Sequence, residues 1–591
     1  MNPIIKYVLA IMLALHFVSS SAQVWEWAQQ GGGTDQEVAL DVIHDDQKDL
    51  YVAGYYSGTA QFGSTTLNSA GGQDGFIAKY GIDGSLIWIN SSSGTGECHI
   101  TAVELGFDGM LYTTGWFNGS LTFSAGDPST FATSGGRDLF VAQFDPATGD
   151  LGYFRSWGGN AASFVEGFDI ATCPTGDVFV AGYFEDDLVI DSVPRYNANT
   201  MMYEASDTFL LSAAGFSDVL IMRLRADGLA YWAKKAGSPE RRSNFDWAQG
   251  MELRGDRLMV TGHYTGTATF GEDDPVQGFT TTTISSKGER DIFLTRIDTV
   301  NGQPIWVQTG GSPEPDWALD VAINSNGDTY ITGAYSDDAG FSDDASHATE
   351  TLLNNFNKRD IFIARYDPNG NLTWLQQAGG FGDEEGSALC LDEQDNLYVT
   401  GYFSSSNADF GGTSLSPVNV RAFFIARYCP QNMLEWVDQA ETGSSWEAPR
   451  AITHPSIHDK VDSLVIVGDF IGTAEFSSTT LTASGIFNDA FVAMYRGIPT
   501  ANNPSIPNFS LSIFPNPTSG LMYLDLPSLQ QATMVEVYDM KGRRIVRKQF
   551  SANQSGQTQS LQIPYASEGV YFLTLSTEGY QPLTRRLLLK H

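Results

Sequence analysis

Short runs of alternating or aromatic-rich apolar residues, separated by turn residues, recur through most of the chain. In the first copy the runs cover residues 38–43, 50–56, 76–80 and 86–89, and Asp83-Gly84 stands in the last turn. Alternation with a period of two predicts half-buried strands, and such dipeptides accept the positive φ of a tight hairpin. Each copy therefore predicts four short antiparallel strands.

The second strand of each copy carries the clearest repeat, a run like Leu50-Tyr51-Val52-Ala53-Gly54-Tyr55-Tyr56 with one glycine in it. Its glycines recur every 61 to 80 residues, at Gly54, Gly115, Gly182, Gly262, Gly333, Gly401 and Gly468. A self-similar spacing of this kind indicates a repeat architecture in which each copy is one structural unit. The third strands are announced by an aspartate, as in Asp74 and Phe76, which we expect to accept backbone N–H bonds. Tryptophans on the fourth strands, such as Trp88, are expected to pack between units.

The last copy lacks a fourth strand, and the start of the chain supplies one. Residues 24–32 resemble residues 372–380, which form a fourth strand and its following loop. An N-terminal strand that completes the last unit closes a ring, and closure removes free strand edges. The sequence thus predicts an all-β protein, with a seven-bladed β-propeller of four-stranded blades over residues 23–496.

The repeats also resemble a known family. Tyr51-Val52-Ala53-Gly54-Tyr55, the Gly-Thr-Ala-x-Phe-Gly pattern of residues 58–63 and 266–271, and the Asp-x-Phe-Ile-Ala pattern of the third strand are similar to the bacterial β-propeller repeats called SBBP. The resemblance implies an extracellular protein and offers no common catalytic motif.

Both ends of the chain carry segments of another kind. Residues 1–22 contain Lys6, an apolar run and a Ser-Ser-Ala ending, which predict a cleaved signal peptide. The run is too short for a membrane span, so no transmembrane segment is expected in the mature chain. Residues 497–509 predict a linker, and residues 510–591 predict seven short strands of an Ig-like sandwich.

Three motifs of the C-terminal segment resemble the type A sorting domain of the type IX secretion system. The matching positions are Pro515, Asn516, Pro517, Gly520, Tyr538, Gly542, Gly569 and Tyr571. The resemblance implies that the type IX machinery is a partner. It also implies export across the outer membrane of a Gram-negative cell, with the product secreted or attached to the cell surface. A generic adhesive module is the alternative interpretation.

The net charge of −36 narrows the choice of partners. Residues 497–591 hold more Lys and Arg than Asp and Glu, so the acidic excess lies in the predicted propeller. Such a surface repels phosphate backbones, which excludes nucleic acid as an expected partner. An extracellular glycan, a protein or a cation stays open, and a monomer is expected. The four cysteines, at Cys98, Cys173, Cys390 and Cys429, are expected to be buried apolar residues rather than disulfides.

Candidate binding residues follow from strand direction. Loops that enter the first strands and loops that join second to third strands lie on one face, where insertions occur at residues 185–217, 272–290 and 336–359. A carboxylate precedes each first strand on that face, at Glu37, Glu97, Glu166, Asp246, Asp316, Glu384 and Glu447. We expect them to ring a channel mouth, with Asp41, Asp169, Gln249 and Asp320, each 13 residues before its repeat glycine, lining the channel below.

Two interpretations of these acids stay open. Converging carboxylates could bind a cation or basic group, Ca²⁺ included, or each could accept backbone N–H bonds of its own loop. Trp247, Trp317 and Trp446 lie beside three of them and could stack on a ligand or pack between blades. No catalytic motif or zinc set is evident, and no cofactor is expected.

The function predicted is that of a binding or adhesion protein that uses the insertion-bearing face. The alternatives are an extracellular polysaccharide hydrolase or lyase with channel carboxylates, and a structural matrix protein.

Overall fold

The fold was analysed in a computed structural model. It describes residues 24–590 except 135, 161, 192–195, 198–201, 204–207, 240–244, 272–280, 345–346, 353–357, 418–419, 443–445, 456–461, 498–511, 515–517, 519–520, 526–532, 540–543, 551–557, 564–568 and 578–579. The chain divides into two compact units, Met1–Pro499 and Thr500–His591. All regular structure in the described residues is β.

The first unit is built from four-stranded antiparallel arrays, each named here by its first strand. Three arrays come from the first half of the chain. They are β2 (Glu37–His44), β3 (Leu50–Phe62), β4 (Thr65–Tyr80) and β5 (Leu86–Gly94); β6 (Cys98–Leu105), β7 (Leu111–Phe117), β10 (Asp138–Phe144) and β11 (Leu151–Trp157); and β12 (Val165–Thr172), β13 (Val178–Phe184), β18 (Asp218–Leu224) and β19 (Ala230–Gly237).

The second half continues the same pattern. Its arrays are β20 (Trp247–Arg254), β21 (Arg257–Phe270), β22 (Thr282–Asp298) and β23 (Pro304–Gly311); β24 (Trp317–Ile323), β25 (Thr329–Ser336), β28 (Arg359–Tyr366) and β29 (Leu372–Ala378); β30 (Glu385–Leu391), β31 (Leu397–Phe403), β34 (Ala422–Tyr428) and β35 (Leu434–Gln439); and β37 (Trp446–Thr453), β38 (Asp462–Ile471) and β41 (Asp489–Gly497) with β1 (Val24–Gly33).

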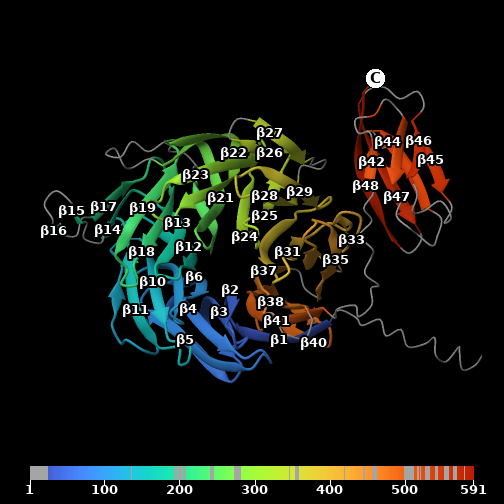
Figure 1. Ribbon diagram of the computed structural model, residues 1–591. Helices are drawn as coiled ribbons and strands as arrows, with labels where there is room; N and C mark the ends of the chain where they lie inside the picture. The colour runs from blue at the N-terminus through green and yellow to red at the C-terminus, as the bar shows by residue number, and fades with distance from the viewer. Residues whose placement is uncertain are drawn as a thin grey trace, which may run out of the picture. The chain divides into compact units, whose positions relative to one another are not determined.

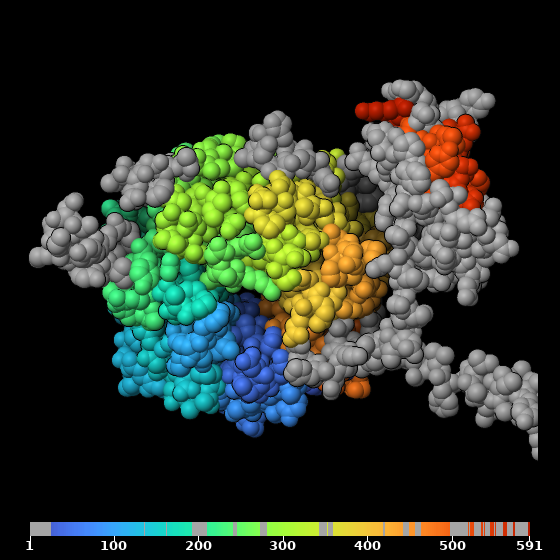
Figure 2. All heavy atoms as spheres, viewed as in Figure 1, coloured from blue at the N-terminus to red at the C-terminus, as the bar shows by residue number. Residues whose placement is uncertain are grey.

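The arrays are arranged radially, as in a β-propeller. Figure 1 shows β2, β6, β12, β24 and β37 together in the middle of the unit, with fourth strands such as β5, β11 and β23 at its rim. In Figure 2 the colours follow one another around the unit until blue N-terminal atoms lie beside orange ones. The protein therefore has an all-β, β-propeller-like fold.

The N-terminal strand joins the end of the repeat region, as the sequence predicts. Residues Val24 to Gly31 of β1 pair antiparallel with Arg496 to Ala490 of β41. Trp25 is only 8% exposed and makes edge-to-face contacts with Phe423, Phe476 and Tyr495. The first residues of the described chain thus bury an aromatic anchor against strands more than 390 positions away.

The aspartates before the third strands form the predicted backbone bonds. Asp74 accepts the N–H of Ala70 at 2.9 Å, and Asp218 accepts that of Ala214 at 2.8 Å. Asp138, Asp291 and Asp489 accept equivalent bonds, whereas Asp360 accepts the N–H of Gly380, after its fourth strand, at 3.2 Å. The predicted backbone bonds are confirmed, and all of these carboxylates except Asp360 fix the turn that enters their own third strand.

Tryptophans of the fourth strands hold neighbouring arrays together. Trp88 Nε1 donates to the carbonyl of Pro146 at 3.1 Å, in the turn between β10 and β11. Trp232 makes the same bond to Thr299, at 3.0 Å. A glycine of the neighbouring turn lies on the indole face, because any Cβ on Gly149 would come within 2.6 Å of Trp88. The predicted packing of tryptophan between neighbouring arrays is confirmed. Glycine suits position 149 for two reasons: its φ is 76°, and the indole lies too close for a Cβ.

The connections between second and third strands differ from the loops expected there. Strand β3 runs on to Phe62, and its Ala60–Phe62 end pairs with Gly31–Gly33 of β1. Similar hairpin ends pair with the preceding fourth strand in β5·β8 (Ser120–Phe123), β19·β21, β23·β26 (Ala339–Asp344) and β36 (Glu441–Thr442)·β39 (Thr473–Phe476). The Gly-Thr-Ala-x-Phe pattern is therefore a strand that links one array to the next. Local alternation could not reveal its distant partner.

Insertions extend from this same face. β14 (Asp187–Asp191) pairs with β17 (Thr208–Ser212), β15 (Tyr196–Asn197) with β16 (Met202–Tyr203), and β26 with β27 (His347–Leu352). Four further short strands complete these hairpins. β9 (Phe131–Ala132) pairs with β8, β32 (Ala408–Asp409) pairs with β33 (Ser414–Leu415), and β40 (Thr479–Thr482) pairs with β39. All four cysteines are free, and Cys98, Cys173 and Cys429 are buried.

The second unit contains two antiparallel sheets. One has the order β42 (Ser512–Phe514), β43 (Leu521–Asp525) and β46 (Thr558–Gln562). The other has the order β45 (Arg544–Phe550), β44 (Thr533–Asp539), β47 (Gly569–Thr577) and β48 (Tyr580–Leu589). Met522, Leu524, Val535, Val537 and Leu573 form its buried core. These strands match the predicted ones within a few residues.

Trp25→Ala tests the contribution of the N-terminal strand. Removing a buried aromatic anchor should lower the free energy of unfolding by about 3–5 kcal/mol. Guanidinium titration followed by circular dichroism measures this loss. Glu26→Gln on the same strand is the control, because Glu26 is exposed and its 2.9 Å ion pair with Arg496 should contribute less than about 1 kcal/mol. Equal effects of the two changes would contradict the assignment.

Gly149→Ala tests the packing of turn glycines against tryptophan. It should destabilise the protein more than Gly176→Ala, which adds a methyl group at a similar φ of 82° with nothing within 4 Å. Both variants carry the cost of a left-handed alanine, about 1–2 kcal/mol, but only the first displaces Trp88. Thermal melts compare them, and equal melting temperatures would refute the contact.

Candidate functional site

A channel of about 570 Å³ runs along the first strands in the middle of the first unit. Every first strand lines it: β2, β6, β12, β20, β24, β30 and β37. Each of these strands has a bulge near its middle, for example between Ala39 and Asp41 or between Ala318 and Asp320. A bulge bends a strand and re-aims its side chains. Here it places Asp41, Asp169 and Asp320 along the channel wall.

The channel aspartates tie neighbouring first strands together. Asp41 Oδ2 accepts the N–H of Val103 at 2.8 Å, from the next array. Asp169 does the same for Met251 at 2.6 Å, and Asp320 for Leu389 at 2.7 Å. The second oxygen of each accepts the N–H of the following residue at 2.7 Å. We call these three residues the aspartate latches.

Small residues make room for the latches. The positions after the bulge that correspond to Asp41 are Ala102 in β6, Gly250 in β20 and Ala388 in β30. Each lies beside the N–H that a latch reaches. Along the chain the position alternates aspartate with alanine or glycine. In β20 a fixed distance of 13 residues before the repeat glycine selects Gln249 and not Gly250. The β20–β21 hairpin is shorter, so Gln249 is the bulge residue and Gly250 occupies the position that corresponds to Asp41.

Burial leaves the channel acids protonated to unusually high pH. It raises the pKa of Asp41 to about 6 and that of Asp320 to about 7, where repulsion from Asp41 adds to the effect. The pKa of Asp169 is also raised well above its usual value, mainly by burial. Burial and nearby acids raise Glu104 and Glu252 to a pKa of about 8. The channel therefore carries less negative charge at neutral pH than its composition suggests.

The predicted ring carboxylates lie either directly before the first strands or within the first two residues of those strands. Asp246 accepts the N–H groups of Ser238 at 2.9 Å and Thr265 at 2.7 Å, and Asp316 accepts those of Ser312 and Ser336. Glu384 bonds to Gly380, Ser404 and Ser405 in the same way. Of the ring residues that the structure describes, none lines the channel cavity. Their loops supply the N–H donors, which turns the carboxylates away from the mouth.

The remaining members of the ring vary. Glu37 is fully buried, accepts the N–H of Gly33 at 2.8 Å, and has its pKa raised to about 9 by burial and by Asp489. Glu166 pairs with Arg137 at 2.5 Å. Glu97 is half-buried and accepts a bond from Asn118 at 3.3 Å. Glu447 lies on β37, and its side chain is outside the described residues, as is that of Trp446.

A belt of aromatic side chains surrounds the entrance to the channel. Tyr55 stacks on His99 with ring centres 3.8 Å apart, and His99 contacts Trp116 at 4.2 Å. Tyr183 stacks on Trp247 at 4.9 Å, and Trp247 contacts His263. Trp317 Nε1 donates a hydrogen bond to Glu385 at 3.1 Å, and Glu385 on β30 is the register partner of Tyr402 on β31. We define the mouth belt as Tyr55, His99, Trp116, Tyr183, Trp247, His263, Trp317 and Tyr402.

Arginines insert into the mouth belt from equivalent positions. Each lies directly before the residue at which the buried part of its third strand begins. The four are Arg137, Arg290, Arg359 and Arg421. Arg137 lies over Trp116 at 3.8 Å, Arg421 over Tyr402 at 3.3 Å, and Arg290 and Arg359 near Trp317 at 6.0 and 5.4 Å. A guanidinium over a ring is attractive, most of all where water is excluded. Sequence reasoning named Trp247 and Trp317 as possible stacking residues but missed the other aromatic residues and the arginines, although the positions after the repeat glycine and directly before the buried part of the third strand were available as signals.

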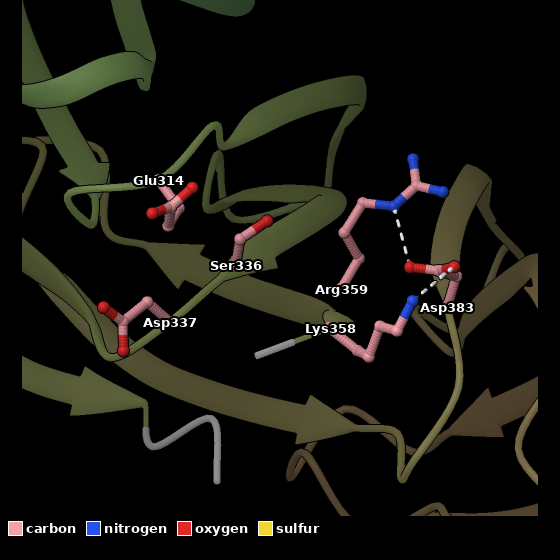
Figure 3. Close-up of a pocket in the computed structure, with 6 residues that line it drawn as sticks. All are labelled: Glu314, Ser336, Asp337, Lys358, Arg359 and Asp383. Carbon is pink, nitrogen blue, oxygen red and sulfur yellow. Dashed lines mark hydrogen bonds and ion pairs between the residues drawn. The ribbon is translucent and has the colours of Figure 1, made fainter. Parts of the chain in front are cut away.

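A smaller cavity of about 270 Å³ opens beside Arg359 (Figure 3). Arg359 and Lys358 both approach Asp383, at 3.4 and 3.6 Å. Glu314 and Asp337 line the opposite side, as Figure 3 shows. Arg359 therefore lies near Trp317 of the mouth belt and also lines a charged cavity.

Exposed apolar side chains also occur on this face. Phe164, Phe216, Phe381, Val420, Ile486 and Phe487 come from loops that enter first strands or join second to third strands, with exposures from 38% to 82%. Among the described residues, no group of three or more His, Cys, Asp or Glu side chains is arranged to hold a metal ion. His458 lies outside the described part of the chain, and His454 stacks on Tyr398.

The second unit has a recognisable family. Its strands and core span the residues matched by a family model described as a secretion system C-terminal sorting domain, residues 512–590. These residues match the sorting-domain family. The sorting domain makes the chain a substrate of the type IX secretion machinery, secreted and attached to the cell surface.

The motif residues of the sorting domain are only partly visible. Tyr538 and Gly569 lie on β44 and β47, and Tyr571 is 5% exposed. Pro515, Asn516, Pro517, Gly520 and Gly542 lie outside the described residues. No helix in the described part of either unit is long and apolar enough to span a membrane.

The chain is similar to a WD repeat-containing protein and to a regulatory protein. An uncharacterized WD repeat-containing protein of Acanthamoeba polyphaga mimivirus is 21% identical over 79% of this chain and 38% of its own length. The regulatory protein FlaEY of Caulobacter vibrioides is 28% identical over 22% of this chain and 13% of its own. The chain thus spans less than half the length of these relatives.

Among solved structures, a quinohemoprotein alcohol dehydrogenase from Comamonas testosteroni is similar over 80% of this chain and 76% of its own. The TM-score is 0.37 and the identity 11%. A protein of unknown function from Bacteroides caccae covers 66% of this chain, with a TM-score of 0.27.

Glu104→Gln tests the buried channel charge through pH. In the folded chain burial and Asp41 raise the pKa of Glu104 from its usual 4.5 to about 8. The folded state therefore binds more protons than the unfolded state between these values, and stability falls as pH rises through that window. The variant should lose part of this fall, narrowing the difference in melting temperature between pH 5 and pH 8 by roughly one or two degrees.

The exposed Glu475→Gln serves as the control for this experiment, since its side chain lies on the surface of β39. Differential scanning fluorimetry at both pH values compares the two variants with the parent. A Glu104→Gln profile parallel to that of the parent would contradict a buried, protonated Glu104.

Proposed function

We propose that the protein is an extracellular binding or adhesion protein whose ligand docks on the insertion-bearing face. In this proposal the first unit, residues 23–496, is a seven-bladed β-propeller of SBBP type. A signal peptide precedes it, and an Ig-like sorting sandwich follows the linker. The observation that carries the proposal is that exposed phenylalanines and the mouth belt lie on one face.

The composition of this face suits recognition. Aromatic residues and arginine are enriched in binding hot spots, since they bury a large area at a modest cost in side-chain freedom. Trp247 and Trp317 are half-buried, and the exposed Phe381 stands in the loop before β30. Connections on a rigid array are the usual carriers of such sites.

A second candidate is a polysaccharide hydrolase or lyase that uses channel carboxylates. The observation in its favour is the pKa of about 8 at Glu104 and at Glu252, as a general acid at neutral pH requires. Against it, both oxygens of each aspartate latch already accept backbone N–H bonds. The latches are better suited to holding strands than to moving protons.

Phe381→Ala and Phe107→Ala test the choice of face. The two side chains are 67% and 68% exposed, and Phe107 lies in the β6–β7 turn on the opposite face. Full-length protein should be screened on glycan arrays and against surface extracts, and the best ligand titrated with each variant. We expect Phe381→Ala to weaken binding about tenfold and Phe107→Ala to leave it unchanged.

The reverse order of effects would move the site to the other face. Turnover of a glycan that is abolished by Glu104→Gln would favour the enzyme instead.

A further inference from the structure

The arginines of the mouth belt form a cationic cluster within an acidic protein. The chain carries a net charge of −36, yet four of its arginines stand at equivalent positions around one opening. Arg450 joins them from the bulge of β37, where it lines the channel. The turn itself does not require arginine at this position, since Gln73, Ser217 and Asn488 occupy it in the other arrays.

The cluster is densest between β28 and β37. Arg359, Arg421 and Arg450 all act on one carboxylate, Glu385, which also accepts the N–H of Trp317. Arg359 further approaches Asp383, and Arg450 bonds to Asp469 at 2.8 Å. Lys358 adds another cation at the edge of the 270 Å³ cavity. Burial lowers the pKa of Arg421; Tyr402 and Glu385 oppose this lowering, and the charges of Arg359 and Arg450 add to it.

Beside Arg290, the buried side chain of His263 has no hydrogen-bond partner among the described residues. His263 is 3% exposed, and among the described residues neither of its ring nitrogens has a hydrogen-bond partner. Burial and Arg290 lower the pKa of His263 to about 3, which keeps the imidazole neutral, with one donor and one acceptor. A hydroxyl group from water or a ligand would satisfy one of the two nitrogens, and pairing is favoured because a buried polar group without a partner is costly.

We propose that the mouth belt binds an acidic polysaccharide, with Arg290, Arg359 and Arg421 as the residues that recognise its carboxylate groups. This inference rests on the proposed binding function. Guanidinium matches a carboxylate with two parallel N–H bonds, and it keeps this ability while stacked on a ring. The half-buried indole of Trp317, beside Arg290 and Arg359, suits the apolar face of a sugar ring.

The first test needs no variant. Full-length protein is titrated with an oligogalacturonate and with its methyl ester, which keeps every sugar and removes the charge; tryptophan fluorescence reports binding. We expect the ester to bind at least about tenfold more weakly. Binding of the acid form should also fall steeply between about 50 and about 300 mM NaCl. Equal binding of the two ligands, or binding that does not respond to salt, overturns the inference.

The second test assigns the residues. Arg290→Gln and Arg421→Gln should each weaken oligogalacturonate binding about tenfold, and Arg421→Lys less than Arg421→Gln. Arg225→Gln is the matched control, since Arg225 is exposed and pairs with Asp227 in the turn before β19, on the opposite face. Unchanged binding by folded glutamine variants overturns the assignment.

The outcomes also separate the two proposals. If the acid form does not bind but a neutral glycan or a protein binds in a way that Phe381→Ala weakens, the carboxylate inference fails and the binding function stands. If nothing binds this face, both fail.

Discussion

The pairing of β1 with β41 is the constraint on which the rest of the first unit depends. Each array is a small sheet that cannot bury both faces alone, so it relies on its two neighbours. A row of such sheets has two unsatisfied ends, and joining the chain's first strand to its last array removes both. Trp25 fixes this joint by packing on Phe423, Phe476 and Tyr495. The central channel and the mouth belt exist only because the ring is held shut.

Three kinds of contact join neighbouring arrays, each at a different distance from the axis of the ring. At the rim, indoles such as Trp88 lie on turn glycines of the next array. Further in, the hairpin ends of second strands pair with preceding fourth strands. At the axis, the aspartate latches accept N–H groups from neighbouring first strands. The acids at the axis are buried, and burial raises their pKa values, to about 8 for Glu104 and Glu252.

The sequence was sufficient for features that are local or that repeat. Strand ranges, turn aspartates, the rim tryptophans and the β1·β41 pairing were all predictable, because each copy displays the same pattern and residues 24–32 resemble an internal segment. The hairpin pairing between arrays was not, since a strand's partner across an interface leaves no mark on its own alternation. The carboxylate ring illustrates the same limit: Asp246 and Asp316 are placed by N–H donors of their loops, which spacing alone cannot reveal. The mouth belt apart from Trp247 and Trp317 was missed because it becomes visible only when positions from different arrays are superposed.

Crosslinking across the joint measures the central claim most directly. Ala28 and Ala493 are register partners in β1 and β41, and both are buried. Ala28→Cys with Ala493→Cys should form a disulfide on mild oxidation, identified by peptide mass mapping. Ala28→Cys with Val492→Cys should not, since a shift of one residue places the side chains on opposite faces. Failure of the first pair to crosslink, or crosslinking by both pairs alike, would contradict a ring closed by the N-terminal strand.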